Sequence, residues 1–147
     1  YTPDVTVFKT DTGRPKLMDE KDWYNVDVIT CAAPNLRERP SNRFNQANGD
    51  RAVKVSDREL LEIHKKRLTR IMDVAALNGD EVVILGAFGC GAFQNKPEVV
   101  ARAAKEVIAD YMRAFKTIEF AVYCPPRDDT NFKVFKRVIG AYNKSIL

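Results

Sequence analysis

A glycine-rich loop between an apolar run and a proline carries the clearest chemical signal in this sequence. The run Val82–Leu85 is apolar and mostly β-branched, which predicts a short buried strand, and Pro97 predicts the start of a helix. Between them, Gly86, Gly89 and Gly91 allow the backbone to adopt positive φ and let a ligand approach without a Cβ in the way. Backbone N–H groups in such a loop, close to a helix N-terminus, suit a phosphate or pyrophosphate.

Two common phosphate-binding loops do not fit this segment. The first and third glycines have the Walker A spacing, but Ala92 and Phe93 occupy the positions that require Lys and Ser or Thr. The dinucleotide-binding fingerprint fails because Gln94 replaces its third glycine. Phe88 and Phe93 flank the glycines and are suited to enclosing a sugar or base beside a diphosphate. A tight strand-to-helix turn that binds nothing is the alternative interpretation.

The segment Gly86-Ala-Phe-Gly-Cys-Gly-Ala-Phe-Gln-Asn95 closely resembles the diphosphate loop of the microbial-type poly(ADP-ribose) glycohydrolases, a branch of the macrodomain fold. Three further segments agree with this resemblance and follow the family's order: Tyr1–Phe8, Asp27–Asn35 and Phe120–Cys124. The resemblance therefore spans nearly all of the chain. It implies an α/β fold, a three-layer α/β/α macrodomain-like sandwich with a mostly parallel or mixed sheet, incomplete at its N-terminus.

The resemblance implies an ADP-ribose site centred on the loop. The residues expected to hold the diphosphate are Gly86, Ala87, Phe88, Gly89, Cys90, Gly91, Ala92 and Phe93. Phe93 and Asn95 are expected to face the distal ribose. No cofactor is expected.

Two other segments are expected to border this site. Ala33, Pro34 and Asn35 follow a predicted strand, and ligands of open α/β sheets bind beyond the carboxyl ends of the strands. These three residues are therefore assigned to the pocket edge. Asn131 and Phe132 are candidates for the adenine and ribose side, although helix capping alone would also explain the polar residues 128–131.

The sequence departs from the family at the catalytic carboxylates. The family carries them in a Gly-Gly-Gly…Gln-Glu-Glu motif upstream of the matched part, whereas this chain has neither a Gly-Gly-Gly run nor a Glu-Glu pair. No catalytic residue is assigned, and we interpret the chain as the C-terminal part of the family's domain or as a member without that segment. It is expected to bind ADP-ribose or poly(ADP-ribose) on modified proteins and to hydrolyse ribose–ribose bonds only with the upstream segment. A non-catalytic ADP-ribose reader is the alternative.

Composition and charge narrow the class of protein. The 147 residues are 45% hydrophobic and 30% charged, which predicts one globular domain over residues 1–147. No apolar run reaches the roughly 18 residues of a membrane span. A net charge of +4 suits an anionic ligand. The basic cluster at residues 65–70 has no aromatic residues between its charges, so it is interpreted as a solvated helix face rather than a nucleic-acid site. The three cysteines lack zinc-site spacing, so no metal is expected. Because an odd number of cysteines does not indicate a disulfide framework, a reducing cytoplasm is the expected location.

The remaining elements follow from capping signals and periodicity. Ser56-x-x-Glu59 is a capping box that predicts the start of a helix, which Asn78-Gly79 is expected to end. His64 falls on the apolar stripe of this helix and is interpreted as a packed structural histidine. The other predicted elements are strands at Val5–Phe8, Val26–Cys31 and Thr117–Cys124, a helix from Pro97, and a final helix capped by Asp128–Thr130. Alternating strands and helices predict parallel pairing through helical crossovers.

Overall fold

The computed structural model describes residues 1–39 and 53–140, and the chain divides into two compact units, Tyr1–Thr30 and Cys31–Leu147. Each unit is described below by itself. The single domain expected over the whole chain stays a prediction. None of the helices in the described ranges is long and apolar enough to span a bilayer.

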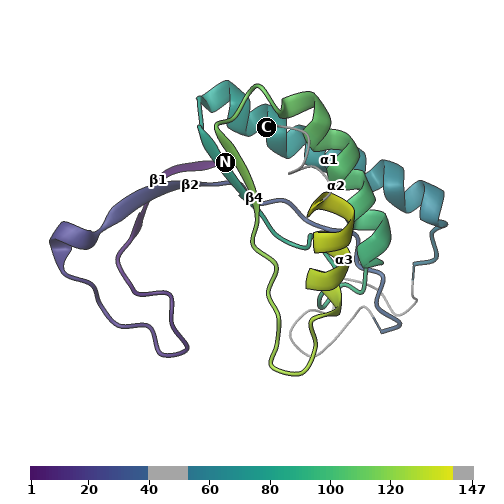
Figure 1. Ribbon diagram of the computed structural model, residues 1–147, viewed down its shortest axis with the longest axis horizontal. Coiled ribbons are helices and arrows are strands. Elements are labelled where there is room, and N and C mark those ends of the chain that lie inside the picture. Colours follow the sequence, from purple (N-terminus) through teal and green to yellow (C-terminus); the bar gives the residue numbers. More distant parts are fainter. Residues whose placement is uncertain (40–52, 141–147) are drawn as a thin grey trace. The chain divides into compact units, whose positions relative to one another are not determined.

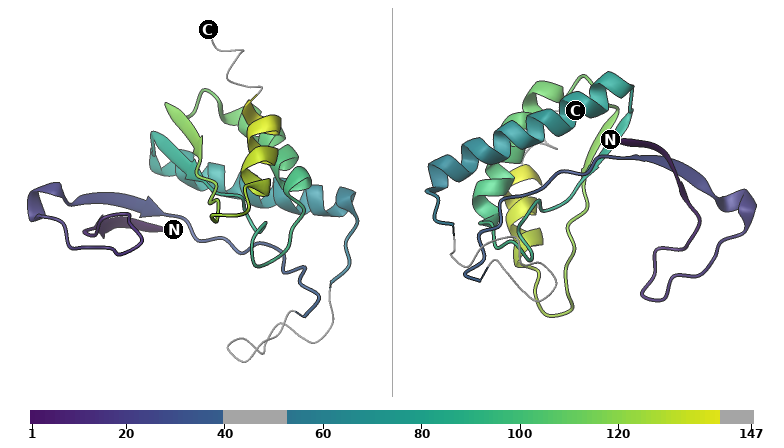
Figure 2. Two further views of the ribbon diagram at one scale, coloured as in Figure 1. Left: turned by 60° about the horizontal axis from the view of Figure 1, so that its bottom comes forward. Right: turned by 180° about the vertical axis from the view of Figure 1, so that it is seen from behind.

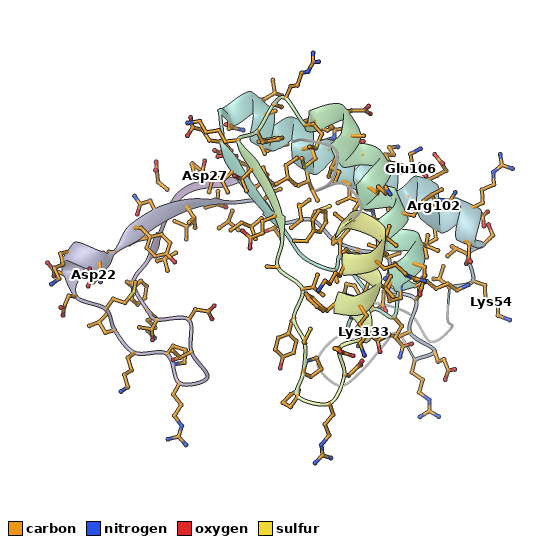
Figure 3. All side chains as sticks on the ribbon, viewed as in Figure 1. Asp22, Asp27, Lys54, Arg102, Glu106 and Lys133 are labelled. Carbon is orange, nitrogen blue, oxygen red and sulfur yellow. The ribbon has the colours of Figure 1, made fainter. Side chains whose placement is uncertain are left out.

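The first unit is an antiparallel hairpin. Strand β1 (Thr2–Val7) pairs with β2 (Tyr24–Val28), and Val5 lies opposite Val26 (Figure 1). A short 3-10 helix at Glu20–Asp22 precedes β2, and Figure 3 labels Asp22 in it and Asp27 on the strand. The ring of Trp23 packs 6.0 Å from that of Phe8, which closes the long connection between the strands. The second strand ends at Val28, three residues before the expected end at Cys31.

In its described residues, the second unit is an α/β arrangement of three helices and two parallel strands. Its elements in chain order are α1 (Asp57–Asn78), β3 (Val82–Leu85), α2 (Pro97–Tyr111), β4 (Thr117–Phe120) and α3 (Thr130–Ile139). Strands β3 and β4 pair in parallel, from Val82 opposite Thr117 to Leu85 opposite Phe120. The expected α/β class and the parallel crossover through α2 are confirmed, although β4 ends four residues earlier than predicted.

The helices of this unit lie on one face of the two strands, and α2 packs between α1 and α3 (Figures 1 and 2). The alternation along β3 agrees with this arrangement. Val83 and Leu85 are buried beneath the helices, whereas Val82 and Ile84 are 52% and 64% exposed on the other face.

Local sequence signals explain where the helices begin and end. The Ser56 hydroxyl accepts a hydrogen bond from the Glu59 N–H, and the Glu59 carboxylate accepts one from the Ser56 N–H, so the predicted capping box is confirmed. These bonds also lower the pKa of Glu59. Gly79 ends α1 at φ +80°, and Pro97 occupies the first turn of α2.

Small side chains let the helices approach closely. Ala101, Ala103 and Ala104 of α2 are almost fully buried. At the rim of the α1–α2 contact, Glu106 lies 3.0 Å from the Lys65 ammonium of α1 and 3.2 Å from Arg102, which Figure 3 labels beside it on α2. The helices α1 and α2 are therefore closely packed, and the glycine loop leads directly into α2.

Candidate functional site

The glycine loop joins the end of β3 to the start of α2, and one of its three glycines is required by backbone geometry. Gly89 has φ +77°, and a Cβ there would lie 2.6 Å from the Cβ of Ala33 and 2.7 Å from the Nδ2 of Asn95. Gly86 and Gly91 do not adopt positive φ, so the conformational freedom of glycine is used at Gly89 alone among the three. The second positive φ in this region belongs to Gln94, at +56°.

Asn95 connects the loop to the segment that follows Cys31. Its side chain is only 2% exposed, and its amide nitrogen donates to the carbonyls of Pro34 at 2.7 Å, Gly89 at 2.9 Å and Phe93 at 3.3 Å. Its backbone N–H also donates to the Gly89 carbonyl, at 3.0 Å. One buried amide therefore holds both sides of the loop and the neighbouring segment together. The expected contact of Asn95 with a ribose stays a prediction, because its polar side-chain atoms are engaged by the protein itself.

The remaining polar atom of Asn95 contacts a buried histidine. Its Oδ1 lies 2.9 Å from the Nε2 of His64, and His64 is fully buried on α1, as the packed structural histidine was expected to be. Because the amide nitrogen of Asn95 faces three carbonyls, its oxygen must be the acceptor and Nε2 must carry the proton. Nδ1 is then unprotonated, and it has no hydrogen-bond partner in the part of the chain that the structure describes.

The environment of His64 favours the neutral imidazole. Burial lowers its pKa below the usual value of 6.5, the hydrogen bond to Asn95 opposes this shift, and the charge of Arg67 adds to it. The edge of the imidazole also meets the Phe88 ring, at 5.4 Å between centroids. A neutral His64 therefore contacts two residues of this region, Asn95 by a hydrogen bond and Phe88 by ring packing.

The predicted pocket-edge residues lie directly against the loop. In addition to the Pro34–Asn95 bond, the Leu36 N–H donates to the Phe93 carbonyl at 3.0 Å. The side-chain oxygen of Asn35 accepts from the Nε of Arg37 at 3.1 Å, and the Arg37 guanidinium lies 5.6 Å from the centroid of the Phe93 ring. The tertiary fold thus brings together two segments that the sequence separates by more than fifty residues.

Arg37 is the functional candidate that the sequence reasoning missed. Only its place in a long loop after the Ala-Pro-Asn segment could have drawn attention to it. In the structure it adds a positive charge beside an aromatic ring of the glycine loop.

The loop presents consecutive backbone N–H groups for which the described part of the chain offers no acceptor. The N–H groups of Phe88, Cys90, Gln94 and Asn95 donate within the loop. Those of Gly91, Ala92 and Phe93 have no acceptor among residues 1–39 and 53–140. Gly91 and Ala92 are exposed, and a Cβ at Gly91 would meet no atom within 4 Å. A row of N–H groups of this kind is chemically suited to an anion with several oxygens.

Cys90, in the middle of the loop, is not a reactive thiol. Burial raises its pKa to about 12, and the nearby charge of Glu98 adds to the shift. The side chain instead packs, together with Ala87 and Phe88, against a core cluster that includes Val100 and Phe135. The loop is therefore supported by α2 and α3 as well as by α1.

The candidates for the adenine side lie in the first turn of α3. Asn131 is half-buried, and Phe132 is 42% exposed and lines a groove of about 390 Å³ between β4 and α3. Asp128 accepts a hydrogen bond from the Thr130 N–H at 3.0 Å, and its bonds to Thr130 lower its pKa. Asp128 thus accepts from one N–H group at the start of α3, whereas the N-cap residue Asp129 makes no side-chain capping bond, so the capping interpretation is supported for Asp128 only. A role of Asn131 and Phe132 toward adenine stays a prediction.

Solved structures of bacterial poly(ADP-ribose) glycohydrolases are similar to this chain. The Deinococcus radiodurans enzyme in complex with ADP-ribose matches with a TM-score of 0.74 and 28% identity, over 95% of this chain and 51% of that one. In another crystal form of the same complex the values are 0.71 and 30%, with the same coverage. The Thermomonospora curvata enzyme matches with a TM-score of 0.68 and 27% identity, over 92% of this chain and 45% of that one. Neither a protein-family model nor a curated protein sequence matches the chain.

This chain therefore spans about half the length of the solved structures that it matches. Over that half, its fold is similar to a part of the microbial poly(ADP-ribose) glycohydrolase fold, in agreement with the resemblance of its loop sequence.

Proposed function

We propose that this chain, as part of a domain of the microbial poly(ADP-ribose) glycohydrolase type, binds ADP-ribose units on the loop Gly86–Phe93. The observation that carries the proposal is the row of N–H groups at Gly91, Ala92 and Phe93, which have no acceptor in the described part of the chain. Similar structures have been solved in complex with ADP-ribose. A diphosphate offers the several charged oxygens that such a row of donors requires.

Side chains next to the loop contact the ribose, add charge or hold the loop in place. Phe93 packs against the distal ribose, and Arg37 above its ring adds positive charge on the phosphate side. Asn95 acts as a positioning residue, because its amide holds the loop in the shape that leaves the donors free. Ala33 and Asn35 border the pocket, and Asn131 and Phe132 are the candidates for the adenine side.

The proposed activity of the whole protein is hydrolysis of ribose–ribose O-glycosidic bonds. This reaction needs a carboxylic acid that protonates the leaving oxygen. The 147 residues contain no Gly-Gly-Gly run and no Glu-Glu pair, and the acidic Asp128 has a lowered pKa, which is unfavourable for a general acid. This observation favours a second candidate, a non-catalytic ADP-ribose reader. Residues 1–147 alone are expected not to cleave poly(ADP-ribose). Cleavage by the unmodified chain that disappears in the variant Asp128→Asn would contradict this expectation.

Calorimetry with ADP-ribose and AMP tests the binding proposal. ADP-ribose should bind more tightly, since charge-assisted hydrogen bonds contribute about 1.5–3 kcal/mol each and AMP lacks one phosphate. Gly91→Val should weaken ADP-ribose binding at least about tenfold, because its side chain would project into the open space at the free N–H groups. Gly13→Val is the matched control, since Gly13 also has open space around it but lies in the hairpin unit.

Two results would contradict the proposal. One is equal affinity for AMP and ADP-ribose, and the other is unchanged ADP-ribose binding by Gly91→Val. Poly(ADP-ribose) on modified proteins as the natural partner, and a cytoplasmic location, stay predictions.

A further inference from the structure

A cluster of basic side chains lies along a groove on α1. Lys66, Arg67 and Arg70, together with Cys31 and Ile63, line a groove of about 360 Å³, which we call the basic groove. None of its three cations forms an ion pair with the residues that the structure describes. Lys65, the next residue along the helix, differs in this respect, since it pairs with Glu62 and Glu106. The basic groove therefore concentrates uncompensated positive charge in a hollow, which attracts an anion more strongly than a flat charged face.

One short segment of chain connects the basic groove with the border of the glycine loop, since Cys31 lines the groove and Ala32–Pro34 follow it. The Arg67 guanidinium donates to the Ala32 carbonyl at 2.5 Å, and Ala33 and Pro34, which follow at once, contact Gly89 and Asn95 in the ways described above. Figure 2 shows this segment passing beside α1 on its way to the loop. The segment from Cys31 to Pro34 therefore joins the lining of the basic groove to the residues that border the glycine loop.

We propose that the basic groove binds the phosphates of a neighbouring unit when one unit of poly(ADP-ribose) occupies the glycine loop. This inference rests on the proposed function. Each further unit of the polymer carries a diphosphate, and Lys66 and Arg70 are spaced i, i+4, which places them side by side on one face of the helix. Arg67 holds the Ala32 carbonyl, so Lys66 and Arg70 are the cations that contact the polymer.

The composition of the basic groove favours this polymer over a single-stranded nucleic acid. Sequence-tolerant binding of single strands depends on aromatic side chains on which bases stack. Its lining residues, Cys31, Ile63, Lys66, Arg67 and Arg70, include no aromatic ring. The segment that follows the groove residue Cys31 borders the glycine loop, and that loop is suited to a diphosphate.

The test compares monomer and polymer binding by the double variant Lys66→Gln/Arg70→Gln. Its affinity for ADP-ribose should equal that of the unmodified chain, while its affinity for linear poly(ADP-ribose) of fixed length should fall about tenfold. The dependence of log K on log salt should become shallower by about 1.5, as expected for two lost phosphate contacts. Arg113→Gln/Lys116→Gln removes the same charge from another region and should change neither affinity, and Lys66→Arg/Arg70→Lys should restore polymer binding.

The outcomes separate this inference from the function on which it rests. If the unmodified chain does not bind ADP-ribose, the proposed function is wrong. If the chain binds ADP-ribose but the groove variant and the control bind the polymer equally well, only the basic groove is wrong. If the groove variant loses affinity for single-stranded RNA of equal charge but not for poly(ADP-ribose), the groove is a nucleic-acid site and the inference is overturned.

Discussion

Replacing Asn95 by aspartate should detach the glycine loop from the segment that borders it while leaving side-chain volume almost unchanged. The amide nitrogen of Asn95 donates to the carbonyls of Pro34, Gly89 and Phe93 at 2.7, 2.9 and 3.3 Å. A carboxylate has no hydrogen to donate, so each of these carbonyls would face another oxygen in a buried site.

The cost can be worked out from these contacts. The two short hydrogen bonds contribute about 0.5–1.5 kcal/mol each, and a buried carbonyl without a donor costs about 1–3 kcal/mol. The variant should therefore lose about 2–6 kcal/mol of the free energy of unfolding, measured by urea denaturation. ADP-ribose affinity should fall as well, because the free N–H groups lose their fixed arrangement.

Asn78→Asp is the matched control for this measurement. Asn78 also donates from its amide, to the Val74 carbonyl at 2.7 Å, but it does so at the exposed end of α1. Water can replace that bond, so the control should lose less than about 1 kcal/mol. Equal losses of stability in the two variants would refute the reasoning, because they would show that the buried amide of Asn95 does not hold the loop.

Two further predictions concern buried titratable groups near the loop. Burial lowers the pKa of His64 below 6.5 in the folded protein, so the unfolded chain takes up a proton at a higher pH than the folded chain does. The free energy of unfolding should therefore fall as the pH drops below about 6.5, by at most about 1.4 kcal/mol per pH unit. Denaturation from pH 8 to 5 should show this loss, and His64→Gln should remove it; an identical pH profile for the two proteins would contradict the assignment. The Cys90 thiol, with its pKa raised to about 12, should react with iodoacetamide at pH 8 far more slowly than the exposed Cys124, which mass spectrometry of the labelled peptides can measure. Faster labelling of Cys90 than of Cys124 would contradict the packing of the Cys90 side chain against the core.

The sequence by itself determined the features that depend on neighbours along the chain. The capping box at Ser56, the end of α1 at Gly79 and the proline start of α2 were all predicted, because these signals act within a few residues. The position of the glycine loop between a strand and a helix followed from local patterns in the same way. Strand ends were less certain, and β2 and β4 stop earlier than expected, since pairing partners rather than local preference decide where a strand ends.

Only the tertiary structure decided how the loop is held. Asn95 bonds to Pro34 across 61 positions and to His64 across 31, and no local pattern reports contacts between such distant residues. The same contacts make Gly89, rather than Gly86 or Gly91, the glycine that cannot accept a side chain, because Ala33 and Asn95 occupy the space at its Cα. They also place Arg37 over Phe93. Residue types thus indicated a phosphate loop, while packing between distant segments determined its shape and which N–H groups it leaves free.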